Sequence, residues 1–310
     1  MECQHLSALD RLHLEQPMEK AEDSEEAAII QNRGFAHEAA YLEKAKAVAD
    51  TFIDIAQAGK TRDQKVAATI QAMEKGIDLI YQAAFYDTPL VGYADFLVKV
   101  DTPSQLGDYS YEIIDTKLSK TTRAKFIIQL AFYADLLARV QGRAPIQVHI
   151  VLGNGNKESF HLDDYRYYYQ HLKHRFFEFI QQNEQRGIKI AADESTPFPC
   201  DKCSLCHWRD RCNTWWDETD HLVRVANIQK THIHKLSAAG INTIEALAKL
   251  PPNARVAKIP PPVLARLQHQ ASLQHRAKIT GKRIVELIPP QAIEGNNANT
   301  NDLDAIAEIG

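Results

Sequence analysis

The chain lacks any long apolar run, and its first residues do not read as a leader peptide. No uninterrupted apolar stretch approaches the ~18 residues that a membrane span needs. The opening Met1-Glu2-Cys3-Gln4-His5 has no basic region followed by an apolar one. With 310 residues, 45% hydrophobic and 25% charged, the composition is typical of a soluble globular protein of roughly two domains. We expect a cytoplasmic protein that has no membrane partner.

Cysteine is scarce and unevenly placed. Of the five cysteines, Cys3 stands alone, whereas Cys200, Cys203, Cys206 and Cys212 lie within one short segment. In a reducing compartment such crowding favours a metal or cluster site over disulfides. Four thiolates suit both zinc and an iron-sulfur cluster, so the residues alone leave both open.

The chain as a whole also lacks a net positive charge. Its net charge of -4 argues against a general nucleic-acid coat, but residues 224 to 287 are strongly basic. The only acidic residues there are Glu245 and Glu286, and the basic residues are Arg224, Lys230, Lys235, Lys249, Arg255, Lys258, Arg266, Arg276, Lys278, Lys282 and Arg283. This end of the chain therefore favours a polyanionic partner.

The spacing of apolar residues predicts a mixed α/β core followed by an all-helical end. Helices are expected over 27–50, 63–75, 123–140 and 163–185, and strands over 77–87, 90–100, 111–118, 146–154 and 158–162. These elements predict a small central sheet flanked by helices. From about residue 223 the pattern is helical throughout.

Polar residues recur on consecutive elements of the predicted core. The motif Gly92-Tyr93-Ala94-Asp95 lies on one strand, Asp115-Thr116-Lys117 on the next, and Gln129 and Tyr133 on the following helix. Carboxylates are ligands for a divalent cation, and a lysine can orient the water that attacks phosphorus. Residues two apart on a strand share a face, as do residues four apart on a helix. A solvent-facing strand edge with an incidental Asp/Lys pair is the alternative.

Together with Gly34-Phe35-Ala36-His37, this ordered series resembles the RecB-like nucleases of the PD-(D/E)XK class, which include the Cas4-type nucleases. Their series is G-x-x-H, G-x-x-D, (D/E)-x-K and Q-x-x-x-Y. The resemblance implies a restriction-endonuclease-like core and DNA cleavage that depends on Mg²⁺ or Mn²⁺. It also implies that the metal ligands are His37, Asp95 and Asp115, that the catalytic lysine is Lys117, and that Gln129 and Tyr133 support the site and the DNA backbone.

The same resemblance bears on the cysteines. Cas4-like nucleases hold a [4Fe-4S] cluster with one cysteine near the N-terminus and a distal C-x2-C-x5-C. Cys203, Cys206 and Cys212 match the distal triplet, and Cys3 matches the N-terminal partner. Cys200 is an additional thiol that could complete a local set of four and leave Cys3 free. We expect Cys3 to be the fourth ligand, with zinc as the alternative metal.

Near the basic end, Leu236 to Leu247 (LSAAGINTIEAL) resembles a helix-hairpin-helix element. In this element a glycine-containing turn presents backbone N–H groups to a DNA phosphate. Gly240 would permit the close approach, and Lys230 and Lys235 are candidate DNA contacts. An ordinary helical bundle with a glycine turn is the alternative.

The expected organisation is a nuclease domain with the cysteines over 1–222, a helix-hairpin-helix module over 223–290 and a disordered tail over 291–310. The expected function is a DNA nuclease for single strands or duplex ends in repair, recombination or foreign-DNA processing. The alternatives are a catalytically silent DNA-binding module with a zinc or iron-sulfur site, and a zinc-bearing scaffold for protein partners. Relatives often continue into a helicase or a further nuclease domain. We therefore expect a shortened member or a fragment, which such a domain would join as a partner.

Overall fold

The computed structural model describes residues 3–189 and 195–286, and the predicted tail at 291–310 lies outside them. The chain divides into two compact units, Met1–Asp210 and Arg211–Gly310. This division falls before the boundary at residue 222 that the sequence suggests. Over the described ranges, no helix is both long and apolar enough to cross a membrane.

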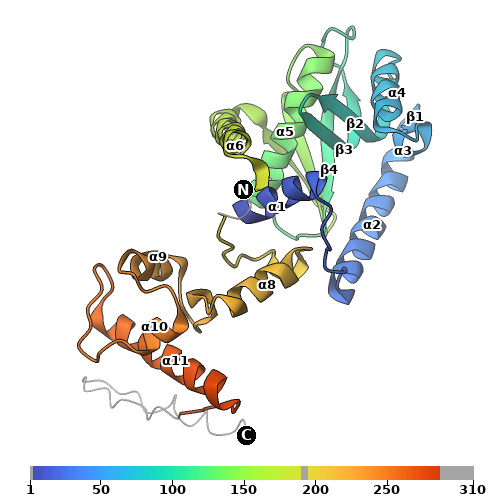
Figure 1. The fold of residues 1–310 in the computed structure, drawn as a ribbon. Coiled ribbons are helices and arrows are strands. Elements are labelled where there is room, and N and C mark those ends of the chain that lie inside the picture. Colours follow the sequence, from blue (N-terminus) through green and yellow to red (C-terminus); the bar gives the residue numbers. More distant parts are fainter. Residues whose placement is uncertain (1–2, 190–194, 287–310) are drawn as a thin grey trace, which may run out of the picture. The chain divides into compact units, whose positions relative to one another are not determined.

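The first unit is built on a six-stranded mixed sheet, in which the strands follow one another in chain order (Figure 1). The β1–β2 and β4–β5 pairs are parallel, and the other neighbouring pairs are antiparallel. The strands are β1 (Phe52–Asp54), β2 (Leu79–Asp87), β3 (Leu90–Val100), β4 (Ser110–Lys117), β5 (Gln147–Leu152) and β6 (Lys157–His161). The predicted mixed α/β architecture is confirmed.

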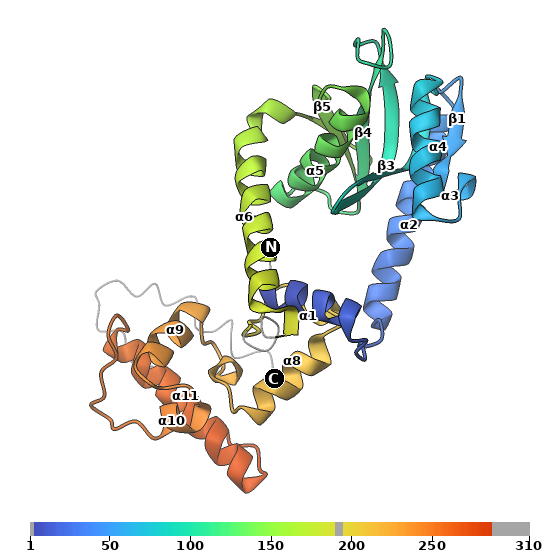
Figure 2. The ribbon, with the colours of Figure 1, turned by 45° about the horizontal axis from the view of Figure 1, so that its top comes forward.

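Helices cover both faces of this sheet. Helix α2 (Glu25–Lys46) contributes Tyr41 and Leu42 to the core on one face. The other face is covered by α3 (Ile55–Ala58), α4 (Arg62–Glu74) and α5 (Ala124–Gln141). In Figures 1 and 2 strands β3 and β4 lie between α2 and α5. The unit also contains α1 (Gln4–Glu15) and α6 (Arg166–Arg186).

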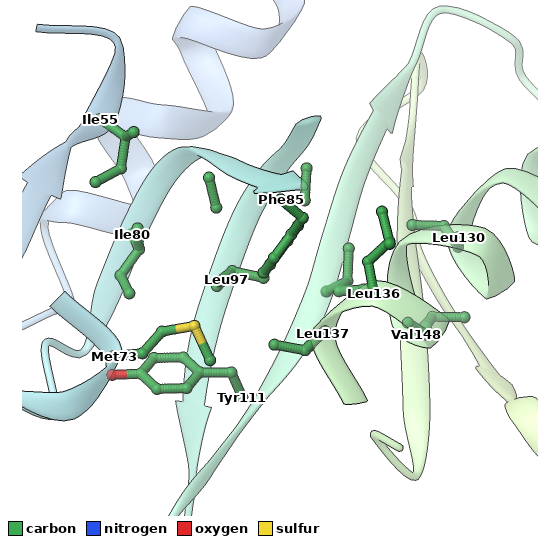
Figure 3. Packing of buried hydrophobic residues seen from close by; sticks show 14 of the residues in the cluster. Ile55, Met73, Ile80, Phe85, Leu97, Tyr111, Leu130, Leu136, Leu137 and Val148 are labelled. Atoms are coloured by element: carbon green, nitrogen blue, oxygen red, sulfur yellow. The ribbon is translucent and has the colours of Figure 1, made fainter. Parts of the chain in front are cut away.

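The larger core lies between the sheet and α5. Leu97 and Val148 of the sheet pack in one cluster with Leu130 and Leu137 of α5, and all four side chains are fully buried (Figure 3). Burying each such side chain stabilises the fold by roughly 1.5–3 kcal/mol. These buried contacts hold α5 against β3 and β4, the strands that carry Asp95 and Asp115.

A largely buried polar link joins β4, β5 and β6. His149 Nε2 lies 2.9 Å from Glu112 Oε2, and His149 Nδ1 lies 2.8 Å from Ser159 Oγ. The backbone N–H of Gln147 donates to Glu112 Oε1 at 3.1 Å. Burial pushes the pKa of Glu112 upward, but the bonds from His149 and Gln147 outweigh it and hold that pKa below its ordinary value. The ionised Glu112 therefore stabilises the folded state.

Glu112→Gln is expected to lower the free energy of unfolding at pH 7 by about 1–3 kcal/mol. Because the pKa of Glu112 is lower in the folded state, its stabilisation is complete above the unfolded pKa and is lost as pH falls through the folded one. The difference between parent and variant should therefore shrink between pH 7 and about pH 3. Urea unfolding at both pH values measures it, and an equal difference at both would contradict this account.

The second unit is helical, as the sequence predicts. Its elements include most of α8 (Arg209–Glu218), together with α9 (Lys230–Ala238), α10 (Ile244–Ala248) and α11 (Pro261–Thr280). Gly240 joins α9 to α10 with a left-handed φ of +79°, a conformation that glycine adopts without strain. The N–H of Ile241 donates to the Leu236 carbonyl at 2.9 Å and closes the end of α9.

Candidate active site

Strands β3 and β4 separate at the candidate site. Their pairing ends at Phe96 and Ile114, so Asp95 and Asp115, the next residue on each strand, lie where the strands diverge. Beyond this point the carboxylate of Asp95, instead of a backbone carbonyl of β3, accepts hydrogen bonds from β4. The backbone N–H and the hydroxyl of Thr116 both donate to Asp95 Oδ2, at 2.9 and 3.1 Å. We call this region, from Asp95 to Lys117 across the two strands, the fork.

Asp115 and Lys117 meet at the fork. Lys117 Nζ lies 2.5 Å from Asp115 Oδ2, and the Asp115 side chain is only 2% exposed. Asp115 Oδ2 is buried, and the ammonium of Lys117 is the cation that faces it. The carboxylates of Asp95 and Asp115 supply the kind of oxygen ligand that Mg²⁺ and Mn²⁺ prefer.

The two carboxylates at the fork influence each other. Burial, and after it the charge of Asp115, together raise the pKa of Asp95 to about 7. Burial also raises the pKa of Asp115, against the opposing effect of Lys117. The charge of Glu38 adds to the increase at both. Buried neighbouring carboxylates resist joint ionisation, which a bound cation would favour.

The α5 residues lie beside these strands. Gln129 Nε2 donates to the Tyr133 hydroxyl at 2.8 Å. A Cβ atom at Gly92 would lie 3.1 Å from Tyr133 Cδ1 and 2.7 Å from Leu136 Cδ1. A side chain at position 92 would therefore force the side chains of Leu136 and Tyr133 to shift. The glycine of the G-x-x-D motif lets α5 bring Tyr133 close to β3.

His37 lies on α2, at the other face of the sheet. Its Nε2 atom is 3.2 Å from the carbonyl oxygen of Val151 on β5. In the ranges described above, no group of three or more His, Cys, Asp and Glu side chains is arranged so that it could hold a metal ion. The structure thus brings Asp95, Asp115 and Lys117 together, without joining His37 to them in such a group.

Two residues of the site region escaped the sequence reasoning. Gln82 has a left-handed φ of +56°, and the β2–β3 pairing skips Gln82 and the opposing Asp95. The alternation of faces breaks there, since Ile80 and Ala83 pack in the same core. Gln82 Nε2 donates to Glu38 Oε1 at 2.5 Å. Glu38 could have been noticed beside His37, but no sequence pattern reveals a left-handed glutamine.

The cysteine segment lies close to the N-terminal helix. Cys3 Sγ accepts the backbone N–H of Leu6 at 3.3 Å and caps α1. Cys200 Sγ and Cys203 Sγ are 3.9 Å apart. Burial raises the pKa of Cys203 and of Cys206, and in both cases the charges of Cys200 and Cys3 raise that pKa further. Cys3 therefore lies within electrostatic reach of the segment. None of the five cysteines, all of which lie in the described ranges, forms a disulfide.

Helix α1 is tied to this segment by packing and hydrogen bonds. Leu9 and Leu12 pack in one cluster with Trp208, which is 1% exposed. Asp10 Oδ1 accepts from Trp208 Nε1 at 2.9 Å and lies 2.7 Å from His207 Nε2. These contacts fix the beginning of the chain against the residues that follow Cys206.

The remaining predicted residues belong to the second unit. Cys212 lies in α8, and Lys230 opens α9. Lys235 Nζ donates to the carbonyl of Lys258 at 2.7 Å. A Cβ atom at Gly240 would meet open space, so glycine is required there by its φ and not by crowding. DNA contact by these residues stays a prediction.

The fold and the fork place the chain in a known superfamily. A mixed sheet flanked by helices is consistent with a PD-(D/E)XK core. The family model for the PD-(D/E)XK nuclease superfamily matches residues 5–213, and the chain therefore belongs to this superfamily. Its members are generally nucleases that hydrolyse phosphodiester bonds, typically with Mg²⁺ or Mn²⁺. No curated protein matches the chain.

Proposed function

We propose that the chain is a metal-dependent DNA nuclease of the RecB-like, Cas4-type branch. In this proposal it cleaves single strands or duplex ends in the cytoplasm, during repair, recombination or the processing of foreign DNA. The fork supports the proposal most directly. The buried carboxylate of Asp115, the partly buried carboxylate of Asp95 and the ammonium of Lys117 converge there.

Each residue of the motif series has a proposed role. Asp95 and Asp115 hold the cation, and His37 would join them as the third ligand that the motif series suggests. Lys117 orients the attacking water through its ammonium group. Bound Mg²⁺ or Mn²⁺ supplies Lewis-acid chemistry, which activates water and offsets charge on the phosphate oxygens.

Gln129 and Tyr133 are proposed to position the DNA backbone. Their hydrogen bond leaves the second amide proton of Gln129 as a donor of the kind that a phosphate oxygen accepts. The packing of Tyr133 beside Gly92 holds this pair near β3.

The cysteines are proposed to hold a structural [4Fe-4S] cluster, with zinc as the alternative. The electrostatic reach of Cys3 to Cys203 and Cys206 supports Cys3 as a ligand. Cys212 enters the proposal from its spacing in the sequence alone. In the second unit, the turn at Gly240 and the basic residues around it are proposed to bind DNA as a helix-hairpin-helix module.

The proposed function predicts cleavage of DNA that requires a divalent cation. End-labelled and circular substrates, single-stranded and duplex, should be incubated with the protein in Mn²⁺ and in EDTA. We expect cleavage only in Mn²⁺, and a loss of about 10²-fold or more in Asp95→Ala because the cation loses a ligand. Resistance of the circles would identify an exonuclease.

The exposed carboxylate of Asp63 on α4 provides the matched control, since Asp63→Ala should cleave at the parent rate. Tight DNA binding without cleavage in any divalent cation would reject the nuclease and leave a DNA-binding module.

A further inference from the structure

A groove runs along α6 on the first unit. It measures about 750 Å³ and lies between α5, α6 and the start of β3, with the beginning of α1 at its edge. Figures 1 and 2 show α6 beside α5. Its lining is aromatic and basic, and none of the lining residues is acidic. The aromatic residues are Phe132, Tyr168, Tyr169, Phe176, Phe177 and Phe179, and the basic ones are Lys173 and Arg175.

Several of these side chains are presented to solvent. Tyr168 is 58% exposed and Phe176 is 38% exposed. They are eight residues apart with Leu172 midway, so they share one face of α6. A contiguous exposed apolar surface rimmed by polar residues is typical of a binding groove.

The charges of the groove favour an anionic occupant. Lys173 Nζ is held by Asp135 Oδ2 at 2.5 Å. Arg175, which is exposed, forms no ion pair with any carboxylate in the part of the chain that the structure describes. Its guanidinium is therefore available to a phosphate, which it can bind through two parallel N–H bonds.

One end of the groove lies on β3, the strand that also carries Asp95. Val91 lines it, and the next residue, Gly92, lies against Tyr133. The ring of Phe132, another lining residue, is 5.8 Å from that of Tyr133. Along β3, Val91 precedes Asp95 by four residues, or about 13 Å. A few nucleotides would span this separation.

We propose that this groove binds single-stranded DNA, with bases stacked on Tyr168 and Phe176 and a phosphate on Arg175. This inference rests on the proposed nuclease function and specifies the form of its substrate. Aromatic faces stack on any base, whereas the paired bases of a duplex are stacked on each other and unavailable. The groove would thus select an unpaired strand without reading its sequence, and lead it toward the fork.

Binding can be measured in EDTA, so that no cleavage interferes. The probes are a labelled 15-nucleotide oligo(dT), a labelled abasic strand of the same length and a labelled blunt duplex. Binding of each probe to the full chain is measured by fluorescence anisotropy. We expect Phe176→Ala to weaken oligo(dT) binding about 5- to 100-fold. Phe176→Trp, which keeps a stacking face, should restore it. Arg175→Gln should weaken binding to the abasic strand and lower the salt dependence by about one phosphate contact.

The control variant is Tyr167→Ala. Tyr167 lies on the same helix and is 76% exposed, but it packs against Arg166 and does not line the groove. It should bind oligo(dT) as the parent does. Phe176→Ala should bind the abasic strand as tightly as the parent does, because that strand has no bases to stack. A loss of equal size on both strands would overturn the stacking proposal.

Other outcomes separate this inference from the proposed function. Parent-like oligo(dT) binding by Phe176→Ala and Arg175→Gln overturns the groove, and the nuclease stands if the parent still cleaves. Reduced binding by these variants in a chain that never cleaves supports the groove and rejects the nuclease. If the substitutions change the molecular mass in sedimentation but not oligo(dT) affinity, the face is a protein interface and the inference is wrong.

Discussion

Lys117→Ala is expected to lower the single-turnover rate of DNA cleavage about 10²- to 10⁴-fold, the range typical of a positioned group that assists proton transfer or orients water. In the fork, Lys117 Nζ lies 2.5 Å from Asp115 Oδ2, and its side chain is 20% exposed. Its ammonium is therefore held beside the carboxylates yet reachable from solvent. The measurement is cleavage of labelled DNA in Mn²⁺ with enzyme in excess.

The substitution also removes the counter-charge of a buried carboxylate, so stability must be measured alongside activity. Lys99→Ala is the matched control. Lys99, which is 30% exposed, pairs with Asp78, the residue before β2, and lies on β3 four residues from Asp95, about 13 Å along the strand. We expect it to lower stability and to leave the cleavage rate unchanged. If Lys117→Ala and Lys99→Ala lose similar stability but only Lys117→Ala cleaves more slowly, Lys117 takes part in the reaction.

Asp115→Asn should reduce the rate by a similar factor, because the cation loses a charged ligand. If Asp115 and Lys117 act as one unit, the double substitution should be no slower than the slower single variant. Independent roles would instead multiply the two losses. If both single variants cleave at rates within about threefold of the parent, the fork residues do not take part in the reaction. Their charges would then have a structural role only.

Much of the first unit could be predicted from local sequence patterns. The alternating strands around Asp95 and Asp115 are present in the predicted positions, and the spacing of two in Asp115-Thr116-Lys117 was enough to predict that the carboxylate and the ammonium meet. The three-residue strand β1 (Phe52–Asp54) was missed, because so short a strand carries no periodicity and exists only by pairing with β2.

The fork itself could not be predicted, because it depends on where two strands stop pairing. Sequence placed Asp95 on a strand, but not beyond the last β3–β4 pair or opposite the left-handed Gln82. That conformation costs a non-glycine residue free energy, and the surrounding contacts, including the bond to Glu38, must maintain it. Contacts between elements that are distant in the sequence maintain this conformation, so no local sequence pattern predicts it.

Anaerobically purified protein is expected to be brown and to contain about four irons per chain, as a [4Fe-4S] cluster requires. Cys203→Ser should abolish the iron and lower the melting temperature by many degrees. The reason is that cluster binding contributes directly to the stability of the segment that α1 packs against. A colourless protein with one zinc would reject the cluster but keep a metal at the cysteines.

The fourth ligand can be identified by comparing Cys3→Ser with Cys200→Ser. Both thiols lie close enough to Cys203 and Cys206 to raise the pKa of each. We expect Cys3→Ser to lose the iron and Cys200→Ser to retain it. The reverse result would define a local set of four cysteines and leave Cys3 as a helix cap.

The serine substitution at Cys3 separates ligand loss from loss of that cap. Cys3 Sγ accepts the Leu6 N–H, and serine is among the preferred residues at this position, so the start of α1 should be as well capped in the variant as in the parent. Any fall in melting temperature would then come from the missing bond to the cluster. With the metal removed from both proteins by a chelator, Cys3→Ser should unfold at the parent temperature. A deficit that persists in the metal-free proteins would mean that Cys3 stabilises α1 by packing alone.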